Sequence, residues 1–202
     1  MAETLIRQLF TKRFIKDILL IVIFGGILYF LVHNPITKPK LPQIDGEWSI
    51  QLMQHPLVFG VAGHNYLVLR NDKNEIQKEL HGLATDSING GWKYYGTDKG
   101  DLLKVWEFNS PRYYVAQKNY AGIILLRGNE SEVKTYWSRS YTCKDAINEK
   151  NIPYPPYGIK VRGDTENSNS VAFTLLRCME LSPKHLGLFT PGWGNDLLNE
   201  MK

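Results

Sequence analysis

The chain has 202 residues, of which 43% are hydrophobic and 22% are charged, and its formal net charge at pH 7 is +4. This composition is typical of one globular domain with its own core plus a short additional segment. Because 24 basic residues are offset by 20 acidic ones and no Lys/Arg-rich block occurs, we expect no nucleic-acid partner.

The first feature along the chain is an uncharged apolar segment, ILLIVIFGGILYFLV at residues 18–32. It is shorter than the roughly 20 residues that cross a bilayer, but Phe14 and Ile15 extend it, and Lys16 can place its amine among the headgroups. A cleaved signal peptide is the alternative, although the HNPITKPKLP that follows lacks a small-residue cleavage pattern. We therefore predict an uncleaved signal anchor, a transmembrane helix at residues 18–33.

Charges on the two sides of this helix predict its orientation. Four basic residues precede it and two follow it: Arg7, Lys12, Arg13 and Lys16, then Lys38 and Lys40. The positive-inside bias places residues 1–17 in the cytoplasm and the C-terminal part outside, so we expect a bacterial inner-membrane protein that faces the periplasm. Residues 34–45 contain three prolines and are expected to form a stiff stalk.

From residue 46 onward the pattern is mainly that of short β-strands. Segments rich in β-branched and aromatic residues are separated by Gly, Pro, Asn or Asp. These segments are 47–53, 56–62, 65–70, 75–81, 102–108, 112–118 and 121–127. Such a run of strands without intervening helices predicts an antiparallel sheet.

Helical spacing begins after Asn129. Val133, Trp137 and Tyr141 recur every four residues, which predicts a helix in ESEVKTYWSRSYTCKDAINEK. A second helix is predicted in the apolar stretch that ends ENSNSVAFTLLRCMEL, at residues 166–181. Residues 46–202 are therefore expected to form an extracytoplasmic α+β domain, in which C-terminal helices pack on the sheet.

Each of the two predicted helices contains one cysteine, Cys143 in the first and Cys178 in the second. A disulfide between them is possible, because disulfides persist outside the cytoplasm. Two buried free thiols are the alternative, since the sequence does not give the distance that a disulfide requires.

Two histidines are predicted to face each other in a hairpin formed by GHNYLVLRNDKNEIQKELHG, residues 63–82. If the turn contains two or four residues, facing positions have numbers that sum to 145. The facing pairs are then Arg70 and Glu75, Leu69 and Ile76, Leu67 and Lys78, and His64 and His81. One imidazole can take a proton from a nucleophile while the other fixes its tautomer.

The alternative is that both histidines are ordinary hydrogen-bonded surface residues. No third His, Asp or Glu stands at a metal-ligand spacing, so we expect no metal and no other cofactor.

The polar residues Asn167, Ser168, Asn169 and Ser170 precede the second helix and have two interpretations. Asn167 or Ser168 is a favourable N-cap, which explains this composition structurally. Alternatively, Ser168 or Ser170 projects toward the histidines as a nucleophile, and backbone N–H groups at the helix start stabilise an oxyanion.

The order of these parts resembles the circularly permuted papain-like superfamily, which includes lecithin:retinol acyltransferase-like proteins and cell-wall peptidases. The resemblance covers roughly residues 56–181. It implies that His64 is the general base, that His81 orients it, and that Ser168 occupies the position of the nucleophile. Asn167, Asn169 and Ser170 would shape the helix mouth and bind substrate. In that family the nucleophile is a cysteine, whereas this chain has Ser168.

These features predict a membrane-anchored hydrolase or acyltransferase that acts on an amide or ester bond of an envelope peptide or lipid. The exchange of cysteine for serine equally suits a catalytically inactive protein that uses the same fold to bind or neutralise a protein partner in the cell envelope. A structural subunit of an envelope complex is a third possibility. The sequence does not indicate the oligomeric state.

Overall fold

The computed structural model describes residues 46–57, 61–94, 96–109, 112, 114, 120–160 and 163–199. The predicted cytoplasmic segment, transmembrane helix and stalk, residues 1–45, lie outside this described part. Within it, no helix has both the length and the apolar character that crossing a bilayer requires.

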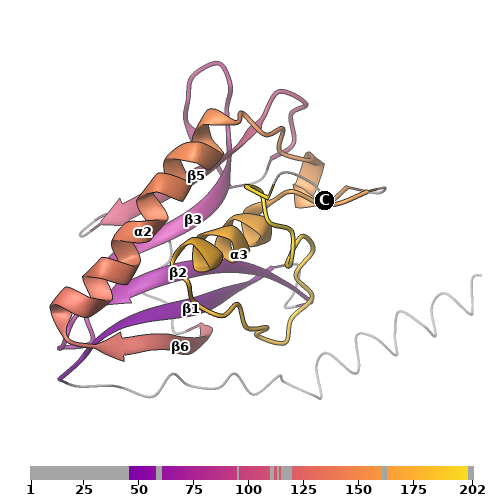
Figure 1. The fold of residues 1–202 in the computed structure, drawn as a ribbon. Coiled ribbons are helices and arrows are strands. Elements are labelled where there is room, and N and C mark those ends of the chain that lie inside the picture. Colours follow the sequence, from indigo (N-terminus) through magenta and orange to yellow (C-terminus); the bar gives the residue numbers. More distant parts are fainter. Residues whose placement is uncertain are drawn as a thin grey trace, which may run out of the picture. The chain divides into compact units, whose positions relative to one another are not determined.

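The described residues form an antiparallel six-stranded sheet followed by helices, which confirms the predicted α+β class (Figure 1). The strands are β1 Trp48–Leu57, β2 Ala62–Arg70, β3 Ile76–Thr85, β4 Trp92–Lys93, β5 Leu102–Asn109 and β6 Ala121–Gly128. The helices are α2 Glu130–Glu149, the short 3₁₀ helix η2 Pro156–Gly158, and α3 Ser168–Cys178.

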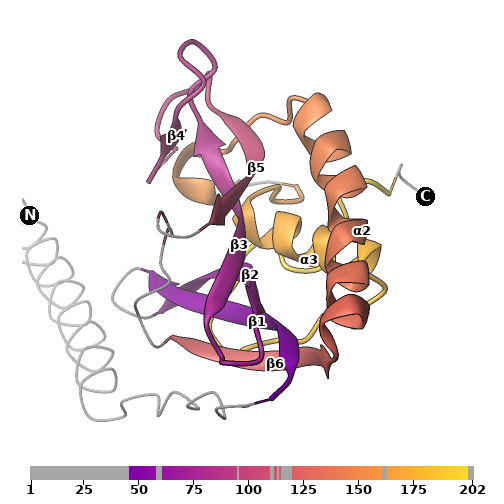
Figure 2. The same ribbon diagram turned by 90° about the vertical axis from the view of Figure 1, so that its left-hand side faces the viewer.

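Both α-helices lie on one side of the sheet (Figure 2). Alternating residues of the strands face them and form the main core, for example Leu67 and Leu69 of β2, which pack with Trp137 of α2 and Leu175 of α3. The intervening residues, such as Tyr66, face the opposite side of the sheet and belong to a smaller cluster. This period of two decides which side chains of β2 and β3 can meet.

The hairpin of β2 and β3 has a different register from the predicted one. Leu67 pairs with Leu80, and Leu69 pairs with Lys78, so facing numbers sum to 147; a bulge then pairs Arg70 with Ile76. The four predicted pairs, including His64 with His81, are therefore wrong as backbone partners. A shift of two residues, unlike a shift of one, leaves each side chain on the predicted face.

The physical reason for the shift lies in the turn. The Asn71 side chain accepts hydrogen bonds from the backbone N–H groups of Lys73 and Glu75, and Asn74 adopts a left-handed conformation with φ of 59°. The turn thus includes Glu75, one residue more than predicted, and the bulge adds the second residue of the shift.

The predicted strand at 56–62 is also wrong. Pro56 and Leu57 end β1, whereas Ala62 begins β2. Pro56 has no backbone N–H to donate, and within the described residues the pairing of β1 with β6 ends before it, at Gln54. Of the predicted strand at 112–118, only Arg112 and Tyr114 are described, and neither is in a strand.

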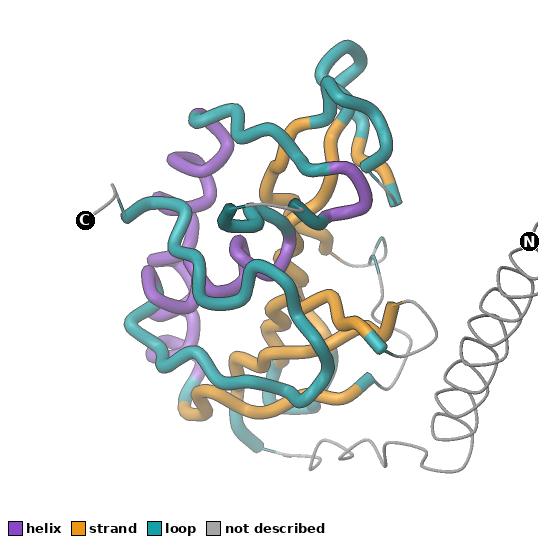
Figure 3. Tube along the Cα trace, turned by 90° about the vertical axis from the view of Figure 1, so that its right-hand side faces the viewer, coloured by secondary structure: helices purple, strands orange, loops and turns teal. Residues whose placement is uncertain are grey.

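Cys143 and Cys178 form a disulfide that joins α2 to the last residue of α3. The long loop that follows α3 returns to the sheet (Figure 3). There Phe189 forms an isolated bridge with Ala62, at the start of β2. The loop that follows α3 is thus held at the beginning of β2, while the disulfide fixes the end of α3 to α2.

Candidate functional site

The candidate site lies where β2 and β3 separate. The last backbone pair between them is Leu67 with Leu80, and beyond it β2 continues beside β1 while β3 continues beside β5. Ala84 and Thr85 of β3 pair with both β4 and β5, so β4 lies on the edge of β3 that β2 has left. The edge of β3 at residues 81–83 therefore faces a gap in the sheet.

The start of α3 occupies this gap and is bonded to β2 through Asn169. The Asn169 side chain accepts a hydrogen bond from Asn65 N at 2.8 Å and donates to Gly63 O at 3.1 Å and to Pro191 O at 3.0 Å. The amide thereby replaces backbone bonds that β3 no longer supplies to β2.

On the other side of the gap, Gly82 of β3 touches α3 directly. A Cβ atom at Gly82 would lie 2.7 Å from Val171 Cβ and 2.9 Å from Ser168 Cα, so no larger residue fits there without displacing the helix. Ser168 is consequently held between the two separated strands. It contacts Gly82, and His81 is the residue that precedes Gly82 in β3.

Three of the predicted site residues have structural roles. Asn167 is the N-cap of α3, with its side-chain oxygen accepting the N–H groups of Asn169 and Ser170 and its amide donating to Gly158 O and Pro191 O. The Ser170 hydroxyl lies 2.9 Å from Thr165 O. Asn167 and Asn169 are 3% exposed and Ser170 is fully buried. The polar atoms of these three side chains are bonded within the domain, and their role in substrate binding stays a prediction.

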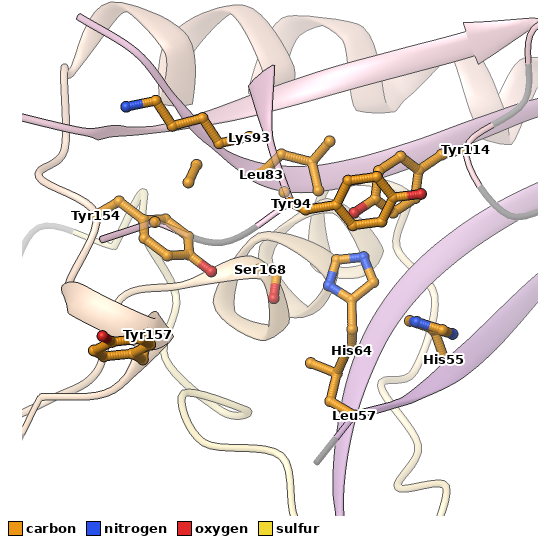
Figure 4. A pocket seen from close by; sticks show the side chains of 13 residues that line it. His55, Leu57, His64, Leu83, Lys93, Tyr94, Tyr114, Tyr154, Tyr157 and Ser168 are labelled. Carbon is orange, nitrogen blue, oxygen red and sulfur yellow. The ribbon is translucent and has the colours of Figure 1, made fainter. Parts of the chain in front are cut away.

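Ser168 differs from these neighbours because it lines a cavity. The cavity has a volume of about 110 Å³, and its lining also includes His64, Leu83 and Tyr154. Figure 4 shows the Ser168 hydroxyl between the hydroxyl of Tyr154 and the ring of His64. Pockets for whole drug-sized ligands have volumes of about 300–1,000 Å³, so this cavity suits one end of a ligand.

The two histidines do meet, although not as opposed residues. His64 Nε2 lies 3.0 Å from His81 Nδ1, and the two ring planes differ by 8°. Extending the observed register by one position sets Tyr66 opposite His81, and the Tyr66 ring stacks on His81 at a centroid distance of 4.5 Å. His64 reaches His81 as the diagonal neighbour on the same face of the sheet. The predicted proximity is thus confirmed, whereas the register from which it was predicted is not.

Glu79 extends this pair and was missed in the sequence. Its Oε2 lies 3.4 Å from His81 Nε2 and accepts a hydrogen bond from Tyr114 N at 2.8 Å. Glu79 and His81 are both fully buried. The available signal was their spacing, since residues two apart in a strand share a face. Glu79, His81 and His64 form what we call the Glu-His-His chain.

Burial lowers the pKa of His64 well below its usual value of 6.5, and the nearby His81 and His55 lower it further. The pKa of His81 is also lowered, first by burial and then by His55. His55 is the direct partner of His64 across β1 and β2. Both members of the His64–His81 pair are therefore neutral at neutral pH, and a neutral imidazole can accept a proton.

Tyr154 is a second residue that the sequence analysis did not select. Burial raises the pKa of its hydroxyl, and hydrogen bonding with Ser168 has the opposite but smaller effect, so Tyr154 is protonated at neutral pH. Gly96 makes room for its ring, because a Cβ atom there would lie 2.4 Å from a ring carbon. No spacing in the proline-rich segment around Tyr154 indicated this role.

The start of α3 also provides a backbone donor. The N–H groups of Asn169 and Ser170 bond to the Asn167 side chain, and that of Val171 bonds to Asn167 O. No acceptor for the Ser168 N–H is found in the described part of the chain. This amide lies at the positive end of the helix dipole, where it can stabilise negative charge.

Neither a family model, nor a curated protein, nor a solved structure matches this chain. In the described ranges, no group of three His, Cys, Asp or Glu residues is arranged to hold a metal ion. The site is thus defined by its own geometry: an α+β domain in which a serine at a helix N-terminus shares a cavity with a buried histidine pair.

Proposed function

We propose that this protein is a serine-dependent hydrolase or acyltransferase of the circularly permuted papain-like type, acting on an amide or ester bond. One observation carries the proposal. Ser168, at the N-terminus of α3, lines the same cavity as His64, and His64 is held from behind by His81 at 3.0 Å. A nucleophile, a base and a residue that orients the base are the three parts that this chemistry requires.

The proposed reaction begins when Ser168 Oγ attacks the carbonyl carbon of the substrate. The serine proton passes to His64 Nδ1, the ring nitrogen that does not face His81. Negative charge develops on the carbonyl oxygen, and the Ser168 N–H and the Tyr154 hydroxyl are the donors best placed to stabilise it.

Collapse of this intermediate breaks the C–N or C–O bond and leaves the acyl group on Ser168. The departing amine or alcohol takes the proton from His64. Water, or an acceptor hydroxyl or amine, then attacks the acyl group and gives a proton to His64, which returns it to Ser168 Oγ. With water the outcome is hydrolysis, and with another acceptor it is acyl transfer.

Serine is a weaker nucleophile than the cysteine of the papain-like family, because the pKa of its hydroxyl is far above that of a thiol. The proposal therefore depends on a base that is neutral in the resting protein. The lowered pKa of His64 supports this, since burial keeps the ring unprotonated at neutral pH.

We further propose that the domain lies outside the cytoplasm, where residues 18–33 anchor it next to envelope peptides or lipids as substrates. Two observations support this location. The sequence places more basic residues before the apolar segment than after it. The Cys143–Cys178 disulfide also suits an oxidising compartment.

A fluorophosphonate probe, which reacts with activated serines, tests the proposal on the full chain in detergent. We expect covalent labelling at Ser168 and its loss in Ser168→Ala and in His64→Ala. Ser138→Ala, which changes a serine on the exposed face of α2, is the matched control and should label normally. If the folded wild-type chain is not labelled, the catalytic proposal fails, and a catalytically inactive binding protein of the envelope becomes the better interpretation.

A further inference from the structure

We infer that Glu79 is a positioning residue, which sets the direction of the protons along the Glu-His-His chain so that His64 presents a lone pair to Ser168. This inference deepens the proposed function and rests on it for its catalytic consequence. The direction of the protons itself can be measured without any activity.

Two contacts connect Glu79 to the cavity. Its Oε2 lies 3.4 Å from His81 Nε2, and His81 Nδ1 lies 3.0 Å from His64 Nε2. The second nitrogen of His64, Nδ1, belongs to the ring that lines the cavity with Ser168. Glu79, His81 and His64 thus follow one another in series, and His64 shares the cavity with Ser168.

The chemistry of the end group decides the tautomers. A carboxylate accepts hydrogen bonds and cannot donate, whereas a neutral imidazole has one N–H and one acceptor nitrogen. The inference therefore places the His81 proton on Nε2, the ring nitrogen 3.4 Å from Glu79 Oε2, and makes its Nδ1 the acceptor. His64 must then donate from Nε2, which leaves a lone pair on Nδ1. Without the carboxylate, the opposite order is equally possible, and His64 Nδ1 then carries a proton and cannot act as a base.

One hydrogen bond to the Glu79 carboxyl group suits the ionised form that the inference requires. Tyr114 N donates to Glu79 Oε2 at 2.8 Å, and hydrogen bonds to a carboxylate stabilise its charged form. Arg70 is also close to Glu79, since burial lowers the pKa of the Arg70 guanidinium and the charge of Glu79 partly offsets this lowering. The rings of Tyr66 and Phe108 pack against His81 at centroid distances of 4.5 and 5.6 Å.

Other titratable groups also face this series, and none of them is a second carboxylate. In the described part of the sheet they are His55 from β1, Tyr66 and Arg70 from β2, and Tyr114. Burial and the nearby Glu79 raise the pKa of Tyr66, so Tyr66 is neutral at neutral pH. Glu79 is consequently the group that can impose one direction on the two imidazoles.

The test is ¹⁵N NMR of the full chain in detergent, with labelled histidine, because the two tautomers of imidazole have distinct ring-nitrogen shifts. In the wild type we expect both His64 and His81 to carry the proton on Nε2. In Glu79→Gln the side-chain amide can donate to His81 Nε2, so the reverse tautomers should appear in both rings. Labelling by the fluorophosphonate should then fall by up to about 10⁴-fold, the loss known when the orienting carboxylate of a serine triad is replaced.

Two further variants make the result specific. Glu79→Asp keeps the carboxylate and should retain the wild-type tautomers. Glu107→Gln is the matched control, because Glu107 is a largely buried carboxylate on β5 whose partner is Lys78, and it should leave the histidine signals unchanged.

Wild-type tautomers that persist in folded Glu79→Gln would overturn the inference, whether or not Ser168 reacts. A wild-type chain with the proton on His64 Nδ1 would overturn it as well, even if Glu79→Gln does not fold. Tautomers that reverse in Glu79→Gln support it even when the wild type is not labelled, so that failure of the proposed function is recognised separately.

Discussion

The two halves of the β2–β3 hairpin differ in which groups form hydrogen bonds with the backbone of β2. In the half near the turn, Leu67 and Leu69 lie in a regular ladder with β3, and their side chains pack into the core. In the other half the ladder ends, and Asn169 of α3 bonds to the backbone of β2 instead. The separated half borders the cavity, whose lining includes His64 of β2 and Gly82 of β3.

This difference shows how the fold creates a site. A strand pair that continued to its end would close the gap and cover residues 81–83. Because β2 and β3 separate after Leu80, the start of α3 can approach, and Ser168 comes to lie beside the same cavity as His64. The imidazole pair crosses the beginning of the gap and connects the two strands by side chains in place of backbone bonds.

The largest effect is expected when the Asn169 side chain, which replaces the backbone hydrogen bonds of β3 to β2, is removed. Asn169→Ala leaves the buried Asn65 N–H and Gly63 O without their partner, and each such group costs about 1–3 kcal/mol. We expect a fall of about 3 kcal/mol in the free energy of unfolding, measured by urea titration with circular dichroism, together with weaker fluorophosphonate labelling.

Asn148→Ala is the matched control for this prediction. The Asn148 side chain accepts from Val105 N at 2.7 Å and donates to Val105 O at 3.2 Å, so it satisfies the backbone of β5 in the same manner but away from the cavity. It should lower stability and leave labelling unchanged. Equal labelling in the two variants would show that Asn169 does not position the site.

A smaller effect is expected from filling the contact between β3 and α3. Gly82→Ala puts a methyl group within 3 Å of Val171 and of the Ser168 backbone, and such overpacking costs about 1–3 kcal/mol. The helix start should move away from β3, so the labelling rate at Ser168 should fall more than stability alone explains.

Gly100→Ala provides the comparison, because the nearest atom there is the hydroxyl of the Ser87 side chain, at 3.2 Å. Labelling that is unaffected in Gly82→Ala would contradict a tight placement of Ser168 by β3.

The smallest effect is expected from pH. Because the pKa values of His64 and His81 are lowered in the folded protein, the unfolded chain binds more protons than the folded one below pH 6.5. Their contribution to stability is therefore complete above pH 6.5 and is lost as the pH falls from there toward the lowered values.

The labelling rate should follow the same direction. We expect it to be constant from pH 8 to about 6.5, apart from changes in the probe itself, and to fall only at lower pH, when His64 becomes protonated. A midpoint at or above 6.5 in the pH profile would indicate that another group controls the reaction.

The sequence was sufficient for those parts of the fold that depend on local patterns. The spacing of Val133 and Trp137 predicted α2, and the small polar residues before Val171 predicted the start of α3. The capping residue, however, was left between Asn167 and Ser168. The structure assigns it to Asn167, and this leaves the Ser168 side chain available to the cavity.

Other features depend on tertiary structure and could not be read from patterns. The register of the hairpin was wrong because the Asn71 side chain organises a longer turn and a bulge follows it. Glu79 was overlooked because a lone carboxylate in a strand has no recognisable motif. Tyr154 lies in a loop, where residue type and spacing do not indicate the direction of the side chain.

The central claim is that His64 activates the residue at position 168, and Ser168→Cys tests it most directly. The chain has two cysteines, both in the disulfide, so the substituted residue is the one free thiol, and its pKa can be measured from the pH dependence of alkylation by iodoacetamide. We predict a thiol pKa well below the usual value of about 8.5, returning toward that value when His64→Ala is added. An ordinary thiol pKa in Ser168→Cys, unchanged by His64→Ala, would contradict the account.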